Sequence, residues 1–189
     1  MAITTTASTG LTVEDLEAMP EDGRRYELID GAIVVTPAPE VSHQRISYRL
    51  QRLLDDAAGP EWEVFQAPTD LDLPGGNRVE PDLIVVEAGR TGARLSLPVL
   101  LLVEIVSGGS RTHDRVTKRS AYAEAGIPAY WLVDMFKATI TCLRLAEDAY
   151  EAYAEGPVVE VDWPVTVRLD LAALAIPKVP APKEAPPPG

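Results

Sequence analysis

Two stretches of the chain are apolar at almost every position, which is the pattern of strands covered on both faces of a sheet. They run from residue 82 to 86 and from 100 to 106. The segment between them, residues 87–99, is long enough for the two strands to be antiparallel neighbours. Shorter β-prone runs bounded by Gly or Pro predict further strands at 62–66, 69–73, 129–133, 139–143 and 150–154.

Apolar residues at helical spacing predict a long helix that is capped by Ser42 and runs to about Ala57. A short helix is expected after Thr12, with an acid three residues on and Pro20 at its end. Asp30-Gly31 separates the runs RYELI and AIVVT and predicts a two-residue hairpin. A third helix is expected to follow residue 110 and to end near Ala125.

Composition fits one soluble domain, with 46% hydrophobic and 24% charged residues in 189. We expect a flexible leader at 1–10, a folded domain at 11–172 and a Pro-rich disordered tail at 173–189. Cys142 is the single cysteine, so an internal disulfide or a multi-cysteine zinc site is excluded. No apolar stretch approaches the ~20 residues of a membrane span, and we expect a cytoplasmic protein without membrane contact.

Glu104 interrupts the run LLVEIV, in which every other side chain is apolar. A buried, ionised carboxylate without a partner costs several kcal/mol, so Glu104 must be paired, protonated or bound to a metal. A buried ion pair with Arg or Lys would satisfy it as well as a metal would.

Asp82 follows Glu80-Pro81 at the mouth of the other buried strand. Its ordinary interpretation is a turn residue, because Pro-Asp is common in turns. If the two strands are neighbours, however, Asp82 and Glu104 converge in an oxygen-rich site of the kind that Mg²⁺ or Mn²⁺ prefers.

Lys118 lies in the helix predicted after Glu104 and shares a helix face with Asp114 and Tyr122. One interpretation is a surface Asp114–Lys118 pair, which contributes only ~0.3–0.5 kcal/mol. The functional alternative places the ammonium beside a metal-bound water or a phosphate oxygen, where it stabilises the transition state.

Several blocks resemble, in order, a known family. They are RRYELIDGAIVVTPAP, SHQRISYRL, EPDLIVV, LLVEIVS and KRSAYAEAGIPAYWLVD. Together they are similar to the Uma2 (DUF820) proteins of the PD-(D/E)XK, restriction-endonuclease-like nuclease superfamily. The resemblance runs from about Leu11 to about Asp170. It implies an α/β fold, in which a mixed β-sheet is flanked by α-helices, with an N-terminal helix and β-hairpin.

The resemblance also implies site residues. Asp82 matches the aspartate of the Pro-Asp motif, Glu104 the second acid, and Ile105 supplies a main-chain carbonyl to the metal. Val106 stands where many relatives in the superfamily have lysine, and Lys118 takes that role from the helix. Glu27 matches an acid near the N-terminus, although its position alone indicates only a polar strand face.

One departure from the family is Gly108-Gly109, where relatives often read Ser-Pro-Ser. The two glycines are expected to loosen the approach to the helix that carries Lys118.

His43, at the start of a helix, is expected to point inward, as a core or capping residue or as an accessory catalytic group together with Tyr122. Net charge is −12 and the pI about 4.6, which argues against DNA binding through a globally positive field. Local arginines could instead steer phosphates, or could be solvated helix faces. The candidates are Arg45, Arg49, Arg52, Arg111, Arg115 and Arg119.

The sequence therefore predicts a Mg²⁺- or Mn²⁺-dependent endonuclease with DNA as its substrate. The alternative is a catalytically inactive nuclease fold that serves as a DNA-binding or protein-interaction module. A homodimer is one option, because nucleases that cut both strands often pair their sites by two-fold symmetry.

Overall fold

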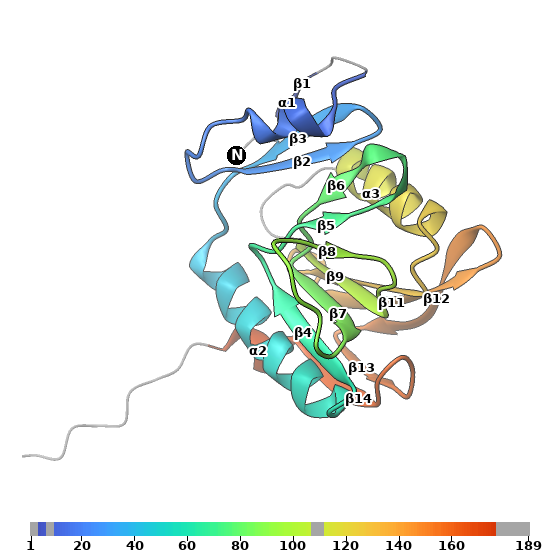
Figure 1. Ribbon diagram of the computed structural model, residues 1–189. Helices are drawn as coiled ribbons and strands as arrows, with labels where there is room; N and C mark the ends of the chain where they lie inside the picture. The colour runs from blue at the N-terminus through green and yellow to red at the C-terminus, as the bar shows by residue number, and fades with distance from the viewer. Residues whose placement is uncertain (1–3, 7–9, 107–111, 177–189) are drawn as a thin grey trace, which may run out of the picture.

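The computed structural model describes residues 4–6, 10–106 and 112–176, with only the main chain given for 4–6 and 112–115. A six-stranded mixed sheet forms the centre, in which β9 and β10 are parallel and the other neighbours are antiparallel (Figure 1). Its strands in spatial order are β12 (Ala149–Gly156), β11 (Thr139–Ala146), β10 (Ala129–Asp134), β9 (Leu101–Val106), β7 (Leu83–Glu87) and β4 (Trp62–Gln66). The expected antiparallel contact between the two apolar strands is confirmed, because β7 pairs with β9.

A second sheet lies across one end of the first (Figure 1). Its strands in order are β1 (Thr4–Thr6), β3 (Ala32–Thr36), β2 (Arg25–Ile29), β6 (Arg78–Val79), β5 (Leu71–Asp72) and β8 (Leu95–Ser96). The strand expected at 69–73 is reduced to β5, and the 3-10 turn η1 (Pro74–Gly76) follows it.

The hairpin between β2 and β3 is confirmed, with Ile29 opposite Ala32. Asp30 and Gly31 both have positive φ, 51° and 69°, as a type I′ turn requires. Gly31 also touches Gly10 closely, since a Cβ at Gly31 would lie 2.7 Å from the Gly10 nitrogen.

Helices cover both faces of the central sheet. Helix α2 (Val41–Ala58) packs its apolar side on the face that carries Val103. Helix α3 (Thr112–Glu124) packs Tyr122 on the opposite face, where Leu102 lies. The strands β7 and β9 are therefore buried on both sides, as their continuous apolar character predicts.

The C-terminal part of the fold differs from the expectation. Strands β13 (Val158–Val161) and β14 (Val167–Asp170) pair with each other, and α4 (Leu171–Ala175) packs on α2. The prediction that the chain is disordered from residue 173 is therefore wrong for the first residues of that segment. They continue helix α4, in which Leu174 is buried. Residues 177–189 lie outside the described part of the chain.

Two expectations near the N-terminus are also corrected. The leader expected to be flexible contains β1, which pairs with Ile33–Val35. The long helix begins at Val41 with Glu40 as its N-cap, two residues before the expected cap, Ser42. Helix α1 (Val13–Glu17) begins as expected, with the Thr12 N–H donating to Asp15 at 2.8 Å.

Within the described residues, the helices are all too short or too polar to cross a bilayer.

Candidate active site

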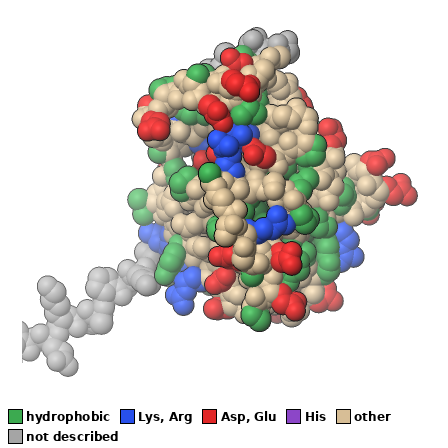
Figure 2. Space-filling model, viewed as in Figure 1, with side chains coloured by type: hydrophobic (Ala, Val, Ile, Leu, Met, Phe, Trp, Pro, Cys, Tyr) green, Lys and Arg blue, Asp and Glu red, His purple; other side chains and the backbone are tan. Residues whose placement is uncertain are grey.

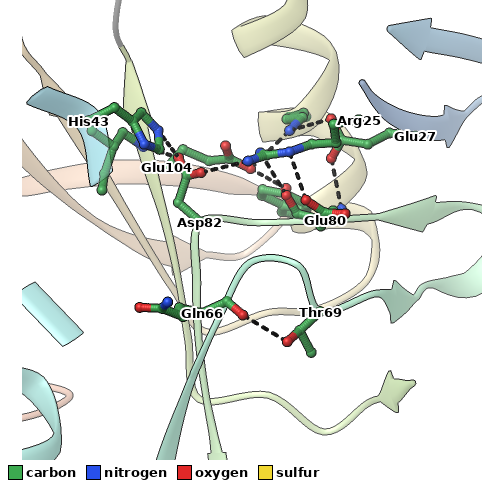
Figure 3. Close-up of polar contacts among 11 residues, drawn as sticks. Arg25, Glu27, His43, Gln66, Thr69, Glu80, Asp82 and Glu104 are labelled. Atoms are coloured by element: carbon green, nitrogen blue, oxygen red, sulfur yellow. Dashed lines mark hydrogen bonds and ion pairs between the residues drawn. The ribbon is translucent and has the colours of Figure 1, made fainter. Parts of the chain in front are cut away.

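Two carboxylates meet where β7 begins beside β9. Asp82 precedes β7, and the register that puts Leu83 opposite Val103 continues to set Asp82 beside Glu104. Both residues are buried, with 2% and 8% of their surface exposed. Glu104 lies two residues after Leu102 and so faces the side of the sheet that α3 covers. The sequence-based juxtaposition of these two acids is therefore found in the fold (Figure 3).

Both oxygens of Asp82 have partners. The Ile105 N–H donates to Oδ2 at 2.7 Å, and His43 Nε2 lies 3.2 Å from the same oxygen. Arg25 Nη2 donates to Oδ1 at 3.0 Å. Burial alone would raise the pKa of Asp82, but the His43 hydrogen bond, the Arg25 charge and the Ile105 N–H together lower it to about 2.

Glu104 has the opposite character. Its Oε1 accepts from Lys118 Nζ at 3.1 Å and from the Tyr122 hydroxyl at 2.7 Å. Burial is the largest influence on the pKa of Glu104 and raises it. The charge of Lys118 lowers this pKa and the charge of Asp82 raises it, and the net result is a pKa of about 7. The carboxylate of Glu104 also helps to hold the pKa of Tyr122 well above its usual value, with burial as the main cause.

Lys118 joins a third carboxylate to the cluster. Its Nζ lies 2.8 Å from Glu27 Oε2, and Glu27 Oε1 accepts from the Glu80 N–H at 2.8 Å. Lys118 is buried, which contradicts the interpretation of a surface pair with Asp114. The side chain of Asp114 lies outside the described residues.

His43 points inward from the first turn of α2, as expected. Because Asp82 is ionised and can only accept, the hydrogen bond assigns the ring proton to Nε2. His43 Nδ1 is buried and has no hydrogen-bond partner among the described residues. His43 therefore orients Asp82 from the side of α2.

Sequence reasoning missed Arg25 and Glu80. Arg25 Nε lies 2.9 Å from Glu80 Oε1, and Arg25 Nη1 donates to the Glu80 carbonyl at 2.9 Å. Figure 3 shows the Arg25 guanidinium reaching from β2 to both Glu80 and Asp82. Strand alternation could have signalled Arg25, because it lies two residues before Glu27 on the same face of β2.

Comparisons with known proteins agree with this architecture. Residues 13–177 match a family described as "Uma2: Putative restriction endonuclease". The chain belongs to the Uma2 family.

Among solved structures, this Uma2 chain is similar to a "putative nuclease belonging to DUF820 from Anabaena variabilis ATCC 29413". The two share 19% sequence identity and a TM-score of 0.68, over 87% of this chain and 97% of that one. At this identity the likeness shows the fold, and it confirms the expected restriction-endonuclease-like α/β class. No curated protein matches the sequence.

The donor set of the Uma2 site suits a hard divalent cation. Asp82 and Glu104 offer carboxylate oxygens, and the Ile105 carbonyl lies on the same strand edge as the N–H that faces Asp82. No group of three or more His, Cys, Asp or Glu within the described residues could hold a metal. Mg²⁺ nevertheless needs only one or two carboxylates, because it keeps waters and substrate oxygens as its other ligands.

The net charge of the cluster also suits a divalent cation. Four carboxylates face two side-chain cations, which leaves an excess of two negative charges when all are ionised. That excess has the same magnitude as the charge of one divalent metal ion and the opposite sign. The members are Glu27, Glu80, Asp82 and Glu104 with Arg25 and Lys118.

The structure gives three of the expected DNA-contacting arginines a partner within the fold. Arg49 donates to the carbonyls of Ala173 and Leu174 at the end of α4, at 2.9 and 2.8 Å. Arg52 lies over the ring of Tyr48. Arg119 donates to the Tyr150 carbonyl. The bonds to main-chain carbonyls leave less of the Arg49 and Arg119 guanidinium groups for phosphate, whereas Arg52 stays exposed on α2.

The other arginine expectations have different outcomes. Arg45 is half-buried on α2. Arg111, Gly108-Gly109 and the side chain of Arg115 lie outside the described residues.

A cavity of about 330 Å³ adjoins the cluster and shares Glu80 as a wall. It contains charges of both signs, among them Asp70, Arg90 and Arg94. Burial raises the pKa values of Asp70 and Glu80. Figure 2 likewise shows acidic and basic side chains intermixed on one face of the molecule.

Proposed function

We propose that this Uma2 protein is a Mg²⁺- or Mn²⁺-dependent endonuclease that hydrolyses phosphodiester bonds in DNA. The observation that carries the proposal is the buried pair Asp82 and Glu104, brought together from neighbouring strands with Lys118 on Glu104. Membership in a restriction-endonuclease-like family supports the reaction class.

Asp82, Glu104 and the Ile105 carbonyl would hold the metal. When bound, a divalent cation supplies Lewis-acid activation of water and neutralises charge on the phosphate. The low pKa of Asp82 keeps this carboxylate ionised and ready to act as a ligand at neutral pH.

The remaining residues act through position and charge. Lys118, held between Glu27 and Glu104, would stabilise the negative charge that develops on the phosphate. Tyr122 orients Glu104 and His43 orients Asp82, each through a hydrogen bond. Neither needs to touch the substrate for this role.

Cleavage assays test the proposal. Supercoiled plasmid, linear duplex and single-stranded DNA are incubated with the full chain and Mg²⁺, Mn²⁺ or a chelator. We expect metal-dependent cleavage that Glu104→Gln and Asp82→Asn abolish, and a fall on the order of 10²–10³-fold for Lys118→Met. Glu160→Gln is the matched control, because Glu160 is a carboxylate on the exposed surface, 74% accessible and paired with Arg168. Cleavage by Glu104→Gln at the wild-type rate would contradict the proposal.

An inactive module that binds DNA or a protein is the second candidate. It is favoured by the existing partners of the site, since Arg25 and Lys118 already pair with its carboxylates. The net charge of −12 also favours it. Calorimetry with Mn²⁺ separates the two, because a folded wild-type protein that binds no metal supports the inactive module.

A further inference from the structure

Arg25 is the cation of the cluster to which the proposed mechanism gives no role. Its side chain is 12% exposed, and it makes three polar contacts with two acidic residues. Two of these contacts go to Glu80, one to its carboxylate and one to its carbonyl. The third goes to Asp82.

The contact with Asp82 falls on the oxygen that a metal would need. Oδ2 is already used by the Ile105 N–H and by His43, both of which are fixed by the sheet and by α2. Oδ1 is the oxygen that faces Arg25, at 3.0 Å from Nη2. A cation that binds Asp82 through Oδ1 must therefore approach an oxygen that already accepts from the Arg25 guanidinium, and the two positive charges compete for it.

The contacts with Glu80 do not depend on Asp82. The donors of Arg25 form a planar fork, and two of them, Nε and Nη1, contact Glu80. These two contacts can hold the guanidinium in place when the hydrogen bond from Nη2 to Asp82 is lost. The released donor would remain beside the metal. Phosphate is the ligand that such a guanidinium favours.

We propose that Arg25 is an internal counterion of the metal site, which holds Asp82 Oδ1 until a divalent cation takes that oxygen and then binds a phosphodiester oxygen of the DNA. This inference rests on the proposed function and deepens it. Arg25 thereby lowers the affinity for free metal and raises the affinity for DNA once metal is bound.

The exposure of the cluster agrees with this order of events. Glu80 and Arg25 have side chains that are 18% and 12% exposed, whereas the Asp82 side chain is 2% exposed. Glu80 also lines the cavity that contains Arg90 and Arg94. A DNA phosphate that approaches through this cavity would reach the Arg25 side of the cluster first.

Calorimetric titration with Mn²⁺ tests the first half of the proposal. At about pH 8, where Glu104 is ionised, we expect Arg25→Met to bind Mn²⁺ on the order of ten-fold more tightly than wild type, equivalent to removing about 1.4 kcal/mol of competition. The double variant Arg25→Met/Glu80→Gln removes one charge of each sign and keeps the cluster's net charge, and it should also bind more tightly. Arg24→Met is the control, because Arg24 is half-exposed and pairs with Asp22 outside the cluster.

Fluorescence polarisation with a labelled DNA duplex tests the second half. In Ca²⁺, with the DNA checked on a gel to be intact, Arg25→Met should bind DNA on the order of ten-fold more weakly than wild type. A residue with a purely structural role would not shift metal and DNA affinity in opposite directions. Arg24→Met should leave both affinities unchanged.

The outcomes are distinct. Wild-type Mn²⁺ affinity in both Arg25 variants overturns the inference, and so does a rise confined to the single variant, which a change in net charge would explain. A DNA affinity that rises together with the metal affinity overturns it as well. If one of these overturning results is found and wild type still cleaves DNA, only the inference about Arg25 fails. If no variant binds Mn²⁺ and wild type does not cleave, the proposed function fails with it.

Discussion

Asp82 and Glu104 lie side by side in one buried cluster, and their pKa values are shifted in opposite directions. Burial acts on both. Asp82 has three donors of its own, whereas Glu104 shares the charge of Lys118 with Glu27. The pKa of one therefore falls to about 2 and that of the other rises to about 7. Such separated pKa values are typical of functional sites.

The raised pKa of Glu104 predicts a pH dependence of stability in metal-free protein. Between about pH 4.5 and 7, the native state keeps the Glu104 proton and the unfolded state has lost it. The free energy of unfolding must therefore fall as the pH rises through this range. Urea denaturation with a chelator measures it, and Glu104→Gln should reduce the decline. Asp70 and Glu80, whose pKa values are also raised, remain in both proteins, so parallel curves for the two would contradict this assignment.

Tyr122 and Tyr150 form a matched pair for a second prediction. Both rings pack on Tyr130, and both hydroxyls donate at 2.7 Å, Tyr122 to Glu104 and Tyr150 to the Ile127 carbonyl. Replacing either by Phe should lower the free energy of unfolding by roughly 1–3 kcal/mol.

Only Tyr122→Phe should also weaken Mn²⁺ binding, because Glu104 then loses the donor that orients it. Calorimetry on both variants provides the comparison. An equal loss of metal affinity in the two would show that the effect is one of stability alone.

At the scale of elements, five parts of the fold meet at the site. Asp82 immediately precedes β7 and Glu104 lies in β9, while α3 brings Lys118 and Tyr122 and α2 brings His43. The hairpin of β2 and β3 supplies Arg25 and Glu27 from the other sheet. The second sheet is thus part of the site and closes it from one side (Figure 1).

The hairpin turn provides a prediction at this scale. Gly31→Ala places a side chain at φ 69° and 2.7 Å from the Gly10 nitrogen, whereas Gly89→Ala has a similar φ of 86° and no neighbour within 4 Å. Left-handed backbone should cost each variant about 1–2 kcal/mol. The close contact should cost Gly31→Ala at least about 1 kcal/mol more. Chemical denaturation compares the free energies of unfolding of the two variants. Equal losses of stability would mean that the backbone at Gly10 can move away from the new side chain at little cost.

At the scale of the whole molecule, a net charge of −12 works against DNA. Several arginines that could have offset it pair with the fold instead, as Arg49 does at the end of α4. The excess negative charge of the cluster adds to the repulsion. In the proposed mechanism, a bound divalent cation would remove that excess at the place where the phosphate binds.

We therefore expect DNA binding to depend on metal. A labelled duplex should bind on the order of ten-fold or more tightly in Ca²⁺ than in a chelator at equal ionic strength, because the metal both neutralises the cluster and contacts phosphate. Polarisation measures the difference. In Asp82→Asn, the increase in DNA affinity caused by Ca²⁺ should be largely lost. An increase as large as in wild type would instead show that the effect comes from Ca²⁺ bound along the DNA and not at the site.

Much of the fold follows from local pattern. The two continuous apolar runs, the Asp30-Gly31 turn and the helical stripe of α2 each specify their element through short-range physics, and they are found within a residue or two of the expected positions. β13, β14 and α4 were not predicted, because such short elements are stabilised by packing, here partly on α2, and not by propensity.

The residues of the site likewise fall into those that the sequence identified and those that only the tertiary structure revealed. Glu104 was identified by the sequence alone, because a carboxylate inside an apolar strand must find a partner wherever that strand lies. Asp82 needed the strand pairing, and Glu27 needed the family resemblance. Arg25 and Glu80 were decided only by the tertiary structure. Each occupies an ordinary polar position in its own segment, and the electrostatic role of each arises from charges that the fold brings to it from other strands.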